Sequence, residues 1–248
     1  MKPLAWKLIN LCQVIFFFFW SVIWQSIAIV IRFVTFSPGI SLWLAHAVWA
    51  PPLIFITGSK VLVQGRERID FSKAHVFVFN HQSTLDIAVV FKVLPVGVRF
   101  IAKKELKNIP FLGWYMRAMG MIFIDRKEPR KARESLKKTG KLMKKGANVV
   151  AFPEGTRGED GRIQPFKKGV FVVAIESSIP IVPIAIEGTR QVMPKNTFQV
   201  RPHLIHVSIG DPIPTENLTY DDREALANKV RKRLIELNLA IGGLGGME

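Results

Sequence analysis

The sequence predicts an α/β fold: a sandwich with a mixed, largely parallel central sheet flanked by helices, preceded by an apolar two-helix hairpin. From Lys60 onward, short segments rich in β-branched and aromatic residues alternate with longer helix-like segments. Residues 1–57 are apolar and almost uncharged, and no repeat or linker divides the remainder. We therefore expect a membrane-associated helical hairpin over residues 1–57, an α/β domain over residues 58–240 and a flexible, glycine-rich tail over residues 241–248.

Composition points to an anionic partner. The 248 residues carry a formal net charge of +16, and residues 1–57 contribute only Lys2, Lys7 and Arg32 with no acid. The basic field therefore belongs mainly to the polar part of the chain, and it suits an anionic membrane surface, a phosphorylated substrate or nucleic acid. The single cysteine, Cys12, excludes a disulfide framework and a cysteine-based zinc site, and no cofactor is expected.

The first apolar segment, residues 8–31, contains no charged residue and is long enough to cross a bilayer. It lacks a small-x-small cleavage signature, so we expect a retained membrane element and not a signal peptide. Its polar residues and their flanks fall on about a third of the helix circumference: Lys7, Asn10, Gln13, Ser21, Gln25 and Arg32. Such a stripe fits an interfacial helix in one leaflet, or a spanning helix that turns the stripe toward a second helix.

The second apolar segment, residues 40–57, follows a turn at Ser37-Pro-Gly39 and contains Pro51-Pro52. We expect the prolines to break this helix and leave a piece too short to span. Five of the six tryptophans lie in residues 1–57, as expected for rings at headgroup depth. The basic amino terminus and the basic domain both favour the cytoplasmic side, which predicts a monotopic or re-entrant hairpin.

The alternating region predicts seven strands and five helices. We place the strands at residues 61–63, 76–79, 99–102, 121–124, 149–152, 181–186 and 204–209. We place the helices near residues 85–93, 111–119, 129–145, 168–177 and 220–239.

The strand over residues 76–79 ends just before His81, and Asp86 follows five residues later. On one helix this spacing would separate the side chains by about 140°, so they can meet only if His81 precedes the helix. Ser83-Thr-Leu-Asp86 has the form of a capping box, which predicts a helix start at Ser83. We expect Asp86 to hold one imidazole nitrogen while the other takes a hydroxyl proton. The alternative is a plain helix cap beside an ordinary loop histidine.

Three neighbouring strand ends also carry charge. The turn after residues 149–152 holds Glu154, Gly155, Thr156, Arg157 and Gly158. The other two strands end at Lys103-Lys104 and at Asp125-Arg126. Guanidinium groups bind phosphate oxygens, and the carboxyl ends of parallel strands border the crevice of an open α/β sheet. We therefore expect His81 and these basic residues to converge there, although each turn alone also fits a solvated surface.

Four ordered segments resemble the motifs of the glycerolipid acyltransferases. They are Asn80–Asp86, Phe123–Arg126, Phe152–Arg157 and Ile181–Ile186, and Pro165-Phe-Lys-Lys-Gly169 is also similar to the family. The resemblance covers about residues 60–215 and is closest to the bacterial 1-acyl-sn-glycerol-3-phosphate acyltransferases. It implies transfer of a fatty acyl group from acyl-CoA or acyl carrier protein to the sn-2 hydroxyl of lysophosphatidic acid, giving phosphatidic acid. It also implies the inner (cytoplasmic) membrane, with the catalytic domain on the cytoplasmic face.

The resemblance implies catalytic roles for His81 and Asp86. It implies that the acceptor phosphate binds to residues of the second and third motifs, Arg126, Glu154, Gly155, Thr156 and Arg157. We add Lys103 and Lys104 from their charge and placement. Direct acyl transfer is expected, because Cys12 lies in the membrane segment and no Gly-x-Ser-x-Gly elbow occurs. Backbone N–H groups at the Ser83 helix start are candidate donors to the oxyanion.

Two alternatives remain at this point. The first is an acyltransferase for another acceptor, such as glycerol 3-phosphate, another lysophospholipid or a lyso-aminolipid. The second is a non-enzymatic tether or carrier on anionic membranes, which would explain the charge and the hairpin alone. Nucleic-acid binding is less favoured, because no nucleic-acid motif occurs and a basic surface beside a membrane anchor has a simpler explanation.

Overall fold

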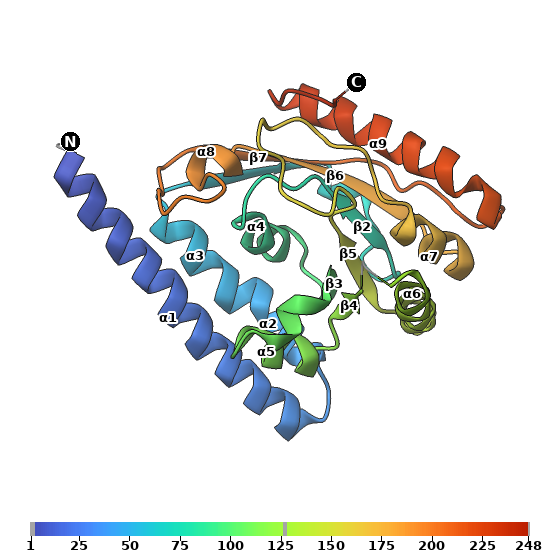
Figure 1. Ribbon diagram of the computed structural model, residues 1–248, viewed down its shortest axis with the longest axis horizontal. Helices are drawn as coiled ribbons and strands as arrows, with labels where there is room; N and C mark the ends of the chain where they lie inside the picture. Colours follow the sequence, from blue (N-terminus) through green and yellow to red (C-terminus); the bar gives the residue numbers. More distant parts are fainter. Residues whose placement is uncertain (1–2, 126–127, 248) are drawn as a thin grey trace.

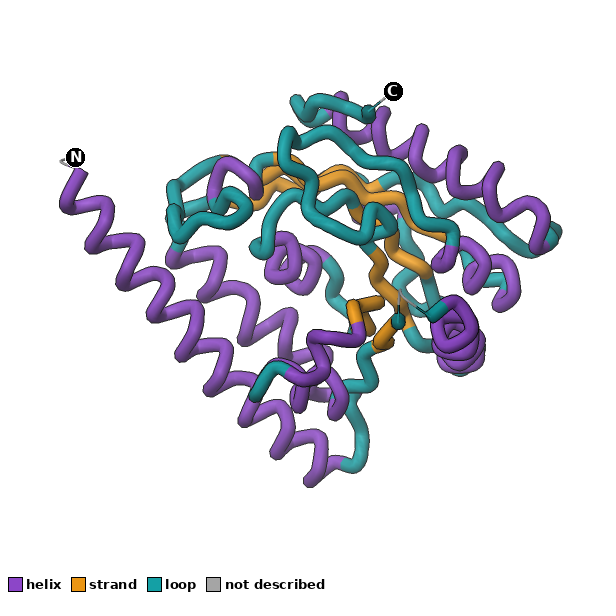
Figure 2. Tube along the Cα trace, viewed as in Figure 1, coloured by secondary structure: helices purple, strands orange, loops and turns teal. Residues whose placement is uncertain are grey.

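The computed structural model describes residues 3–125 and 128–247. In this part of the chain seven strands form one sheet in the order β1-β7-β6-β2-β5-β3-β4. Every neighbouring pair is parallel except β6 and β7, which are antiparallel. The predicted mixed, largely parallel sheet is therefore confirmed, and it lies between two groups of helices (Figures 1 and 2).

All seven predicted strands are present, with bounds that differ by one residue at most. They are β1 (Lys60–Gln64), β2 (Val76–Phe79), β3 (Val98–Lys103), β4 (Ile122–Ile124), β5 (Asn148–Ala151), β6 (Ile181–Glu187) and β7 (Leu204–Ile209). The predictions succeed because these segments are short runs of β-branched and aromatic residues bounded by turns.

The five predicted helices of the domain are also present, and a short one was not predicted. They are α4 (Asp86–Val93), α5 (Leu112–Ala118), α6 (Pro129–Met143), α7 (Gly169–Ser177) and α9 (Arg223–Ala240). The unpredicted helix, α8 (Thr189–Val192), has one turn and so offers no helical period to detect. Short 3-10 turns at Arg66–Arg68, Lys104–Asn108 and Tyr220–Asp222 complete the set.

The core has two layers, one on each face of the sheet. Along β2, Phe77 and Phe79 pack toward α4 and the N-terminal helices, and Val76 and Val78 pack toward α6, α7 and α9. All four side chains are fully buried. Burial on both faces explains why β2 is a continuous apolar run and does not alternate with polar residues.

The N-terminal helix α1 (Pro3–Thr35) buries Asn10, Gln13 and Gln25 together with Trp24 and Ala28 against the rest of the protein. Asn10 Nδ2 donates to the Val200 carbonyl at 2.8 Å, and Gln13 Nε2 donates to the Ile56 carbonyl at 2.9 Å. Leu8 and Phe18 are among many large apolar side chains exposed on the other face. The stripe therefore packs on the second helical segment and the domain, and the exposed face is apolar.

The expected break at Pro51-Pro52 is wrong. The chain is helical from Gly39 to Ile56 through α2 (Gly39–Leu44), a π-helical turn (Ala45–Trp49) and α3 (Ala50–Ile56). The prolines lie in the first turn of α3, where their missing N–H groups cost least, and the π turn before them shifts the backbone register. Residues 4–35 and 39–56 are each long and apolar enough to cross a membrane.

The predicted division into hairpin, domain and tail stays a prediction, but the structure places the tail against the domain. The Ile163 N–H donates to the Gly245 carbonyl at 2.8 Å, and the Met247 N–H donates to the Ile163 carbonyl at 3.1 Å. Gly245 N–H also donates to Asn238 Oδ1 of α9 at 3.0 Å. The glycines of the tail thus allow a close backbone approach.

Candidate active site

The turn after β2 is fixed by an asparagine before it presents a histidine. Asn80 Nδ2 donates to the Ile186 carbonyl, and Asn80 Oδ1 accepts from the Ile186 N–H, both at 2.8 Å. This pair ties the end of β2 to β6 as a further strand pair would. His81 is the next residue, so its backbone position is set by the sheet.

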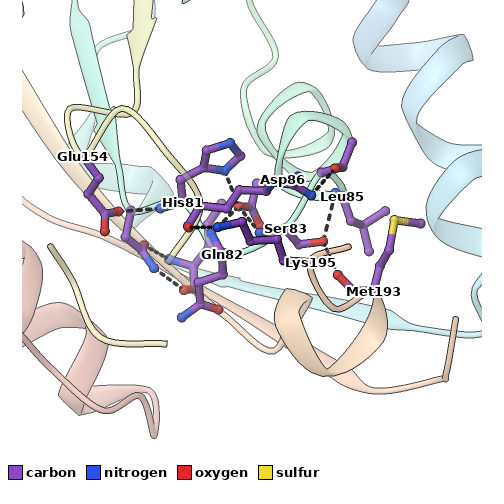
Figure 3. Close-up of polar contacts among 12 residues, drawn as sticks. His81, Gln82, Ser83, Leu85, Asp86, Glu154, Met193 and Lys195 are labelled. Atoms are coloured by element: carbon purple, nitrogen blue, oxygen red, sulfur yellow. Dashed lines mark hydrogen bonds and ion pairs between the residues drawn. The ribbon is translucent and has the colours of Figure 1, made fainter. Parts of the chain in front are cut away.

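The predicted contact between His81 and Asp86 is present (Figure 3). His81 Nδ1 lies 2.7 Å from Asp86 Oδ2, and the Asp86 side chain is fully buried. The same oxygen accepts hydrogen bonds from the N–H groups of Gln82 at 2.7 Å and Ser83 at 2.8 Å. The carboxylate is thus held by three donors, and it fixes the orientation of the imidazole ring.

The helix start differs from the predicted capping box. Helix α4 begins at Asp86, and the acidic half of the box is present because Asp86 accepts from the Ser83 N–H. The Ser83 hydroxyl, however, accepts from the Leu85 N–H and donates to the Met193 carbonyl at 2.7 Å. The expectation that N–H groups at Ser83 face an oxyanion is therefore corrected, since the N–H groups of Gln82 and Ser83 already bind Asp86.

The other nitrogen of His81, Nε2, has no hydrogen-bond partner within residues 3–125 and 128–247. The imidazole stacks on Phe152 with centroids 4.1 Å apart, and the His81 side chain keeps 18% of its surface exposed. One nitrogen is thus held by Asp86, and the ring is accessible to a substrate.

Glu154 bonds to the backbone of the turn that carries His81. Its carboxylate accepts from the His81 N–H at 2.7 Å and from the Gln164 N–H at 2.8 Å, and Glu154 is 5% exposed. Burial raises the pKa of Glu154 to about 7, against the two N–H donors that favour the charged form. Both carboxylate oxygens of Glu154 thus hold backbone N–H groups, and its predicted contact with the acceptor phosphate stays a prediction.

Residues 155–158 of the loop after β5 contact the turn at residues 80–85, which carries His81. Gly155 has a positive φ of 76°, and the Gly158 N–H donates to the His81 carbonyl at 2.9 Å. Arg157 Nη1 donates to Thr84 Oγ1 at 2.9 Å, which places the guanidinium at the start of α4. Thr156 is exposed beside it.

The lysines after β3 lie on the far side of β5 from His81 in the sheet order. Lys104 Nζ contacts Asp125 Oδ2 at 2.5 Å, and this hydrogen bond raises the pKa of Lys104. Lys103 is exposed. Arg126, which the sequence placed in the same group, lies outside the described residues. Strands β2, β5 and β3 are parallel neighbours, so His81, Lys103 and Lys104 lie at the same edge of the sheet.

Some residues beside the site were not predicted. Asn80 and Phe152 lie within the first and third motifs. Asn80 bonds to Ile186 and Phe152 stacks on His81, and both partners are far along the chain. Lys195 Nζ donates to the Arg157 carbonyl at 3.3 Å and contacts Glu159 at 2.8 Å, which no local pattern indicates. In the described part of the chain, no group of three or more His, Cys, Asp and Glu residues could hold a metal ion.

These features place an accessible imidazole, paired with a buried carboxylate, at the carboxyl edge of an α/β sheet. The sequence model of the acyltransferase family matches residues 60–187, which include His81, Asp86, Glu154 and Arg157. The chain belongs to the acyltransferase family, and the resemblance found in its sequence motifs is confirmed.

Its relatives specify the branch. The chain is 38% identical over 204 residues to 1-acyl-sn-glycerol-3-phosphate acyltransferase of Saccharomyces cerevisiae, covering 81% of this chain and 67% of that protein. It is 42% identical over 158 residues to a chloroplastic 1-acyl-sn-glycerol-3-phosphate acyltransferase of Brassica napus, covering 62% and 45%. The crystal structure of the 1-acyl-sn-glycerophosphate acyltransferase of Thermotoga maritima superposes with a TM-score of 0.79 at 25% identity, covering 96% and 98%.

Proposed function

We propose that this protein is a 1-acylglycerol-3-phosphate O-acyltransferase. It moves a fatty acyl group from a thioester, acyl-CoA or acyl carrier protein, to the sn-2 hydroxyl of lysophosphatidic acid and so forms phosphatidic acid. The observation that carries the proposal is the 2.7 Å contact between His81 Nδ1 and the buried Asp86 carboxylate, within a chain of the acyltransferase family.

In the proposed mechanism His81 is the general base. Its Nε2 takes the proton of the acceptor hydroxyl as the oxygen attacks the thioester carbonyl carbon, so a C–O bond forms. The tetrahedral intermediate collapses with loss of the C–S bond, and the imidazolium returns the proton to the leaving sulfur. Asp86 holds the ring and stabilises the imidazolium. Direct transfer is preferred because the single cysteine lies in α1 and the Ser83 hydroxyl is bonded to Met193.

The acceptor phosphate is proposed to bind at the strand ends beside His81. Arg157, held against Thr84, supplies a guanidinium next to the catalytic turn, and Lys104 is anchored by Asp125. Arg126, Lys103 and Glu154 are kept as predicted contacts from the sequence, and Glu154 also holds the backbone of His81.

The hairpin is proposed to place this site at the membrane surface. The exposed face of α1 is apolar, and the basic charge of the domain attracts anionic lipid, at about 1 kcal/mol for each cation near the headgroups. An enzyme held shallowly in the cytoplasmic leaflet meets a lipid acceptor without extracting it. Such placement is consistent with two apolar N-terminal helical segments.

The direct test measures free thiol released from palmitoyl-CoA in the presence of lysophosphatidic acid. We expect His81→Ala to lower kcat by about 1,000-fold and Asp86→Asn by about 100-fold or more, because each removes a part of the base. His203→Ala, at an exposed histidine outside the site, is the matched control. Melting temperatures equal to the wild type separate loss of chemistry from loss of the helix start.

Wild-type activity in both active-site variants would contradict the proposed mechanism, and a covalent acyl adduct on the protein would contradict direct transfer. A panel of acceptors, with glycerol 3-phosphate and other lysophospholipids beside lysophosphatidic acid, tests acceptor choice in the same assay.

A further inference from the structure

A second site with two cations, Arg190 and Lys195, lies on the side of His81 away from Lys103 and Lys104. A pocket of about 290 Å³ opens between the loop after β5 and the loop after β6. Its lining is Gly158, Glu159, Arg190, Pro194, Lys195 and Asn196. Neither cation belongs to the motifs that define the site above, so the pocket has no assigned role.

The guanidinium of Arg190 packs against Gly161 and makes no hydrogen bond or ion pair with the described part of the chain. Its Nε is buried and makes no hydrogen bond within the described residues. The group packs over Gly161, whose φ is 87°, so closely that a β-carbon there would lie 3.1 Å from Arg190 Nε. A guanidinium that is fixed by packing and left unpaired is prepared for an anionic ligand.

The second cation, Lys195, connects the pocket to the catalytic machinery. Its ammonium group contacts Glu159 and the Arg157 carbonyl. Gly158, on the opposite wall, donates to the His81 carbonyl, and the Ser83 hydroxyl binds the Met193 carbonyl two residues before Lys195. Both walls of the pocket are thus bonded to the turn that carries His81. Figure 3 shows the contact between Ser83 and Met193.

The sheet order separates this pocket from the lysines at the other strand ends. Strand β2 lies between β6 on one side and β5, β3 and β4 on the other. Arg190 and Lys195 follow β6, whereas Lys103 and Lys104 follow β3. Because β6, β2 and β3 point the same way, the two groups of cations flank His81 from opposite sides at one edge of the sheet.

Acyl transfer from a phosphopantetheine thioester to a lysophosphatidate joins two phosphorylated substrates at one base. We infer that the pocket formed by Arg190 and Lys195 binds the pantetheine phosphate of the acyl donor, while the acceptor phosphate binds toward β3 and β4. The inference rests on the proposed function. Coenzyme A and acyl carrier protein share this phosphate, so the pocket suits either donor and recognises the arm that both carry.

The experiment compares the wild type, Arg190→Gln and Lys195→Gln, with Lys229→Gln on the exposed face of α9 as a matched loss of charge. KM and kcat are measured for palmitoyl-CoA and, separately, for lysophosphatidate. Loss of one charge-assisted contact is expected to raise the donor KM about 10-fold, with the acceptor KM and kcat changed less than about twofold. Arg190→Lys is included because it keeps the charge and should retain more affinity than Arg190→Gln.

Three further donors identify the phosphate. With palmitoyl-carrier protein and palmitoyl-dephospho-CoA, which retain the pantetheine phosphate, the variants should show the same rise in donor KM. With S-palmitoyl-pantetheine, which has no phosphate, the wild type and the variants should become equal. Binding of unreactive desulfo-CoA gives the same comparison without turnover.

A rise in the acceptor KM with an unchanged donor KM would overturn the inference, as would an equal effect on the phosphate-free donor. Loss of the effect with dephospho-CoA would move the contact to the ribose phosphate and overturn the assignment to the pantetheine phosphate. A wild type that transfers no acyl group from any donor would instead contradict the proposed function. The two failures are therefore distinguishable.

Discussion

At the scale of single residues, Glu154 couples the catalytic turn to proton concentration. Its two carboxylate oxygens hold the backbone of His81 and of Gln164. Burial raises the pKa of Glu154 to about 7, from an ordinary value of 4.5. A residue that holds the backbone of His81, the proposed general base, therefore changes its charge close to neutral pH.

The raised pKa has a definite consequence for stability. The folded protein binds this proton more tightly than the unfolded chain, so the contribution of Glu154 is fully present below pH 4.5 and is lost as the pH rises to about 7. The difference corresponds to about 3 kcal/mol in the free energy of unfolding. Urea unfolding from pH 4.5 to 8 should show a steeper decline in the wild type than in Glu154→Gln.

Glu216→Gln, at an exposed acid, serves as the control and should keep the wild-type decline. The amide at position 154 also turns one acceptor into a donor, so kcat should fall about 10-fold or more. Parallel stability curves for the wild type and Glu154→Gln would show that Glu154 is charged throughout this range.

Residue roles could be predicted where the partner is close in sequence. The contact between His81 and Asp86 follows from a spacing of five residues and a helix start, and both are visible in the sequence. Glu154 and Lys195 bond to backbone groups far along the chain, and their residue types alone could not indicate these contacts. The oxyanion expectation failed because Asp86 uses the same N–H groups.

At the scale of elements, α1 packs on the rest of the protein through polar and apolar side chains and exposes an apolar face. Asn10 is buried, accepts from Arg201 Nη1 at 2.6 Å and donates to the Val200 carbonyl, whereas Leu11 beside it is 56% exposed. Buried polar residues thus take part in the attachment to the domain, and we expect the exposed apolar face to contact lipid.

Two neighbouring substitutions test this division. Asn10→Leu removes the hydrogen bonds that Asn10 makes to the Val200 carbonyl and to Arg201, which keep only their bond to each other. The free energy of unfolding in detergent should therefore fall by about 1 kcal/mol. Leu11→Asn should leave that stability nearly unchanged, but should weaken binding to vesicles about tenfold through the loss of buried apolar surface.

Guanidinium chloride unfolding in micelles and vesicle flotation measure the two quantities. An equal loss of stability in both variants would contradict an outward apolar face.

The elements themselves were largely predictable. All seven strands are short runs between turns, and the central strands β2, β5 and β6 are apolar because they are buried on both faces. The helix through Pro51-Pro52 was predicted wrongly because a local rule about proline takes no account of the π turn that precedes it. Sequence composition does not encode such a turn.

At the scale of the whole molecule, the charge distribution predicts that the amino terminus and the domain lie on the same, cytoplasmic side of the membrane. A monotopic or re-entrant hairpin keeps the amino terminus, the turn at Ser37 and the catalytic edge away from the opposite compartment. A fully spanning hairpin would expose Ser37 on the other side.

Cysteine labelling separates the two arrangements. In a Cys12→Ser background the protein has no other cysteine, so Ser37→Cys introduces a single thiol in the turn between α1 and α2. An impermeant maleimide added on the side opposite the catalytic domain should not label it, and a reporter on residue 1 should lie on the same side as the domain. Labelling from the opposite side would refute the predicted topology.

The reversed direction of β7 and β1 has a practical consequence. Because these two strands oppose β6, the segments that follow them, residues 65–75 and 210–219, emerge at the edge of the sheet opposite His81. Ser72 and Lys73 are exposed there. A fluorophore or an affinity sequence inserted at this point would report on the enzyme during turnover while leaving both substrates unobstructed.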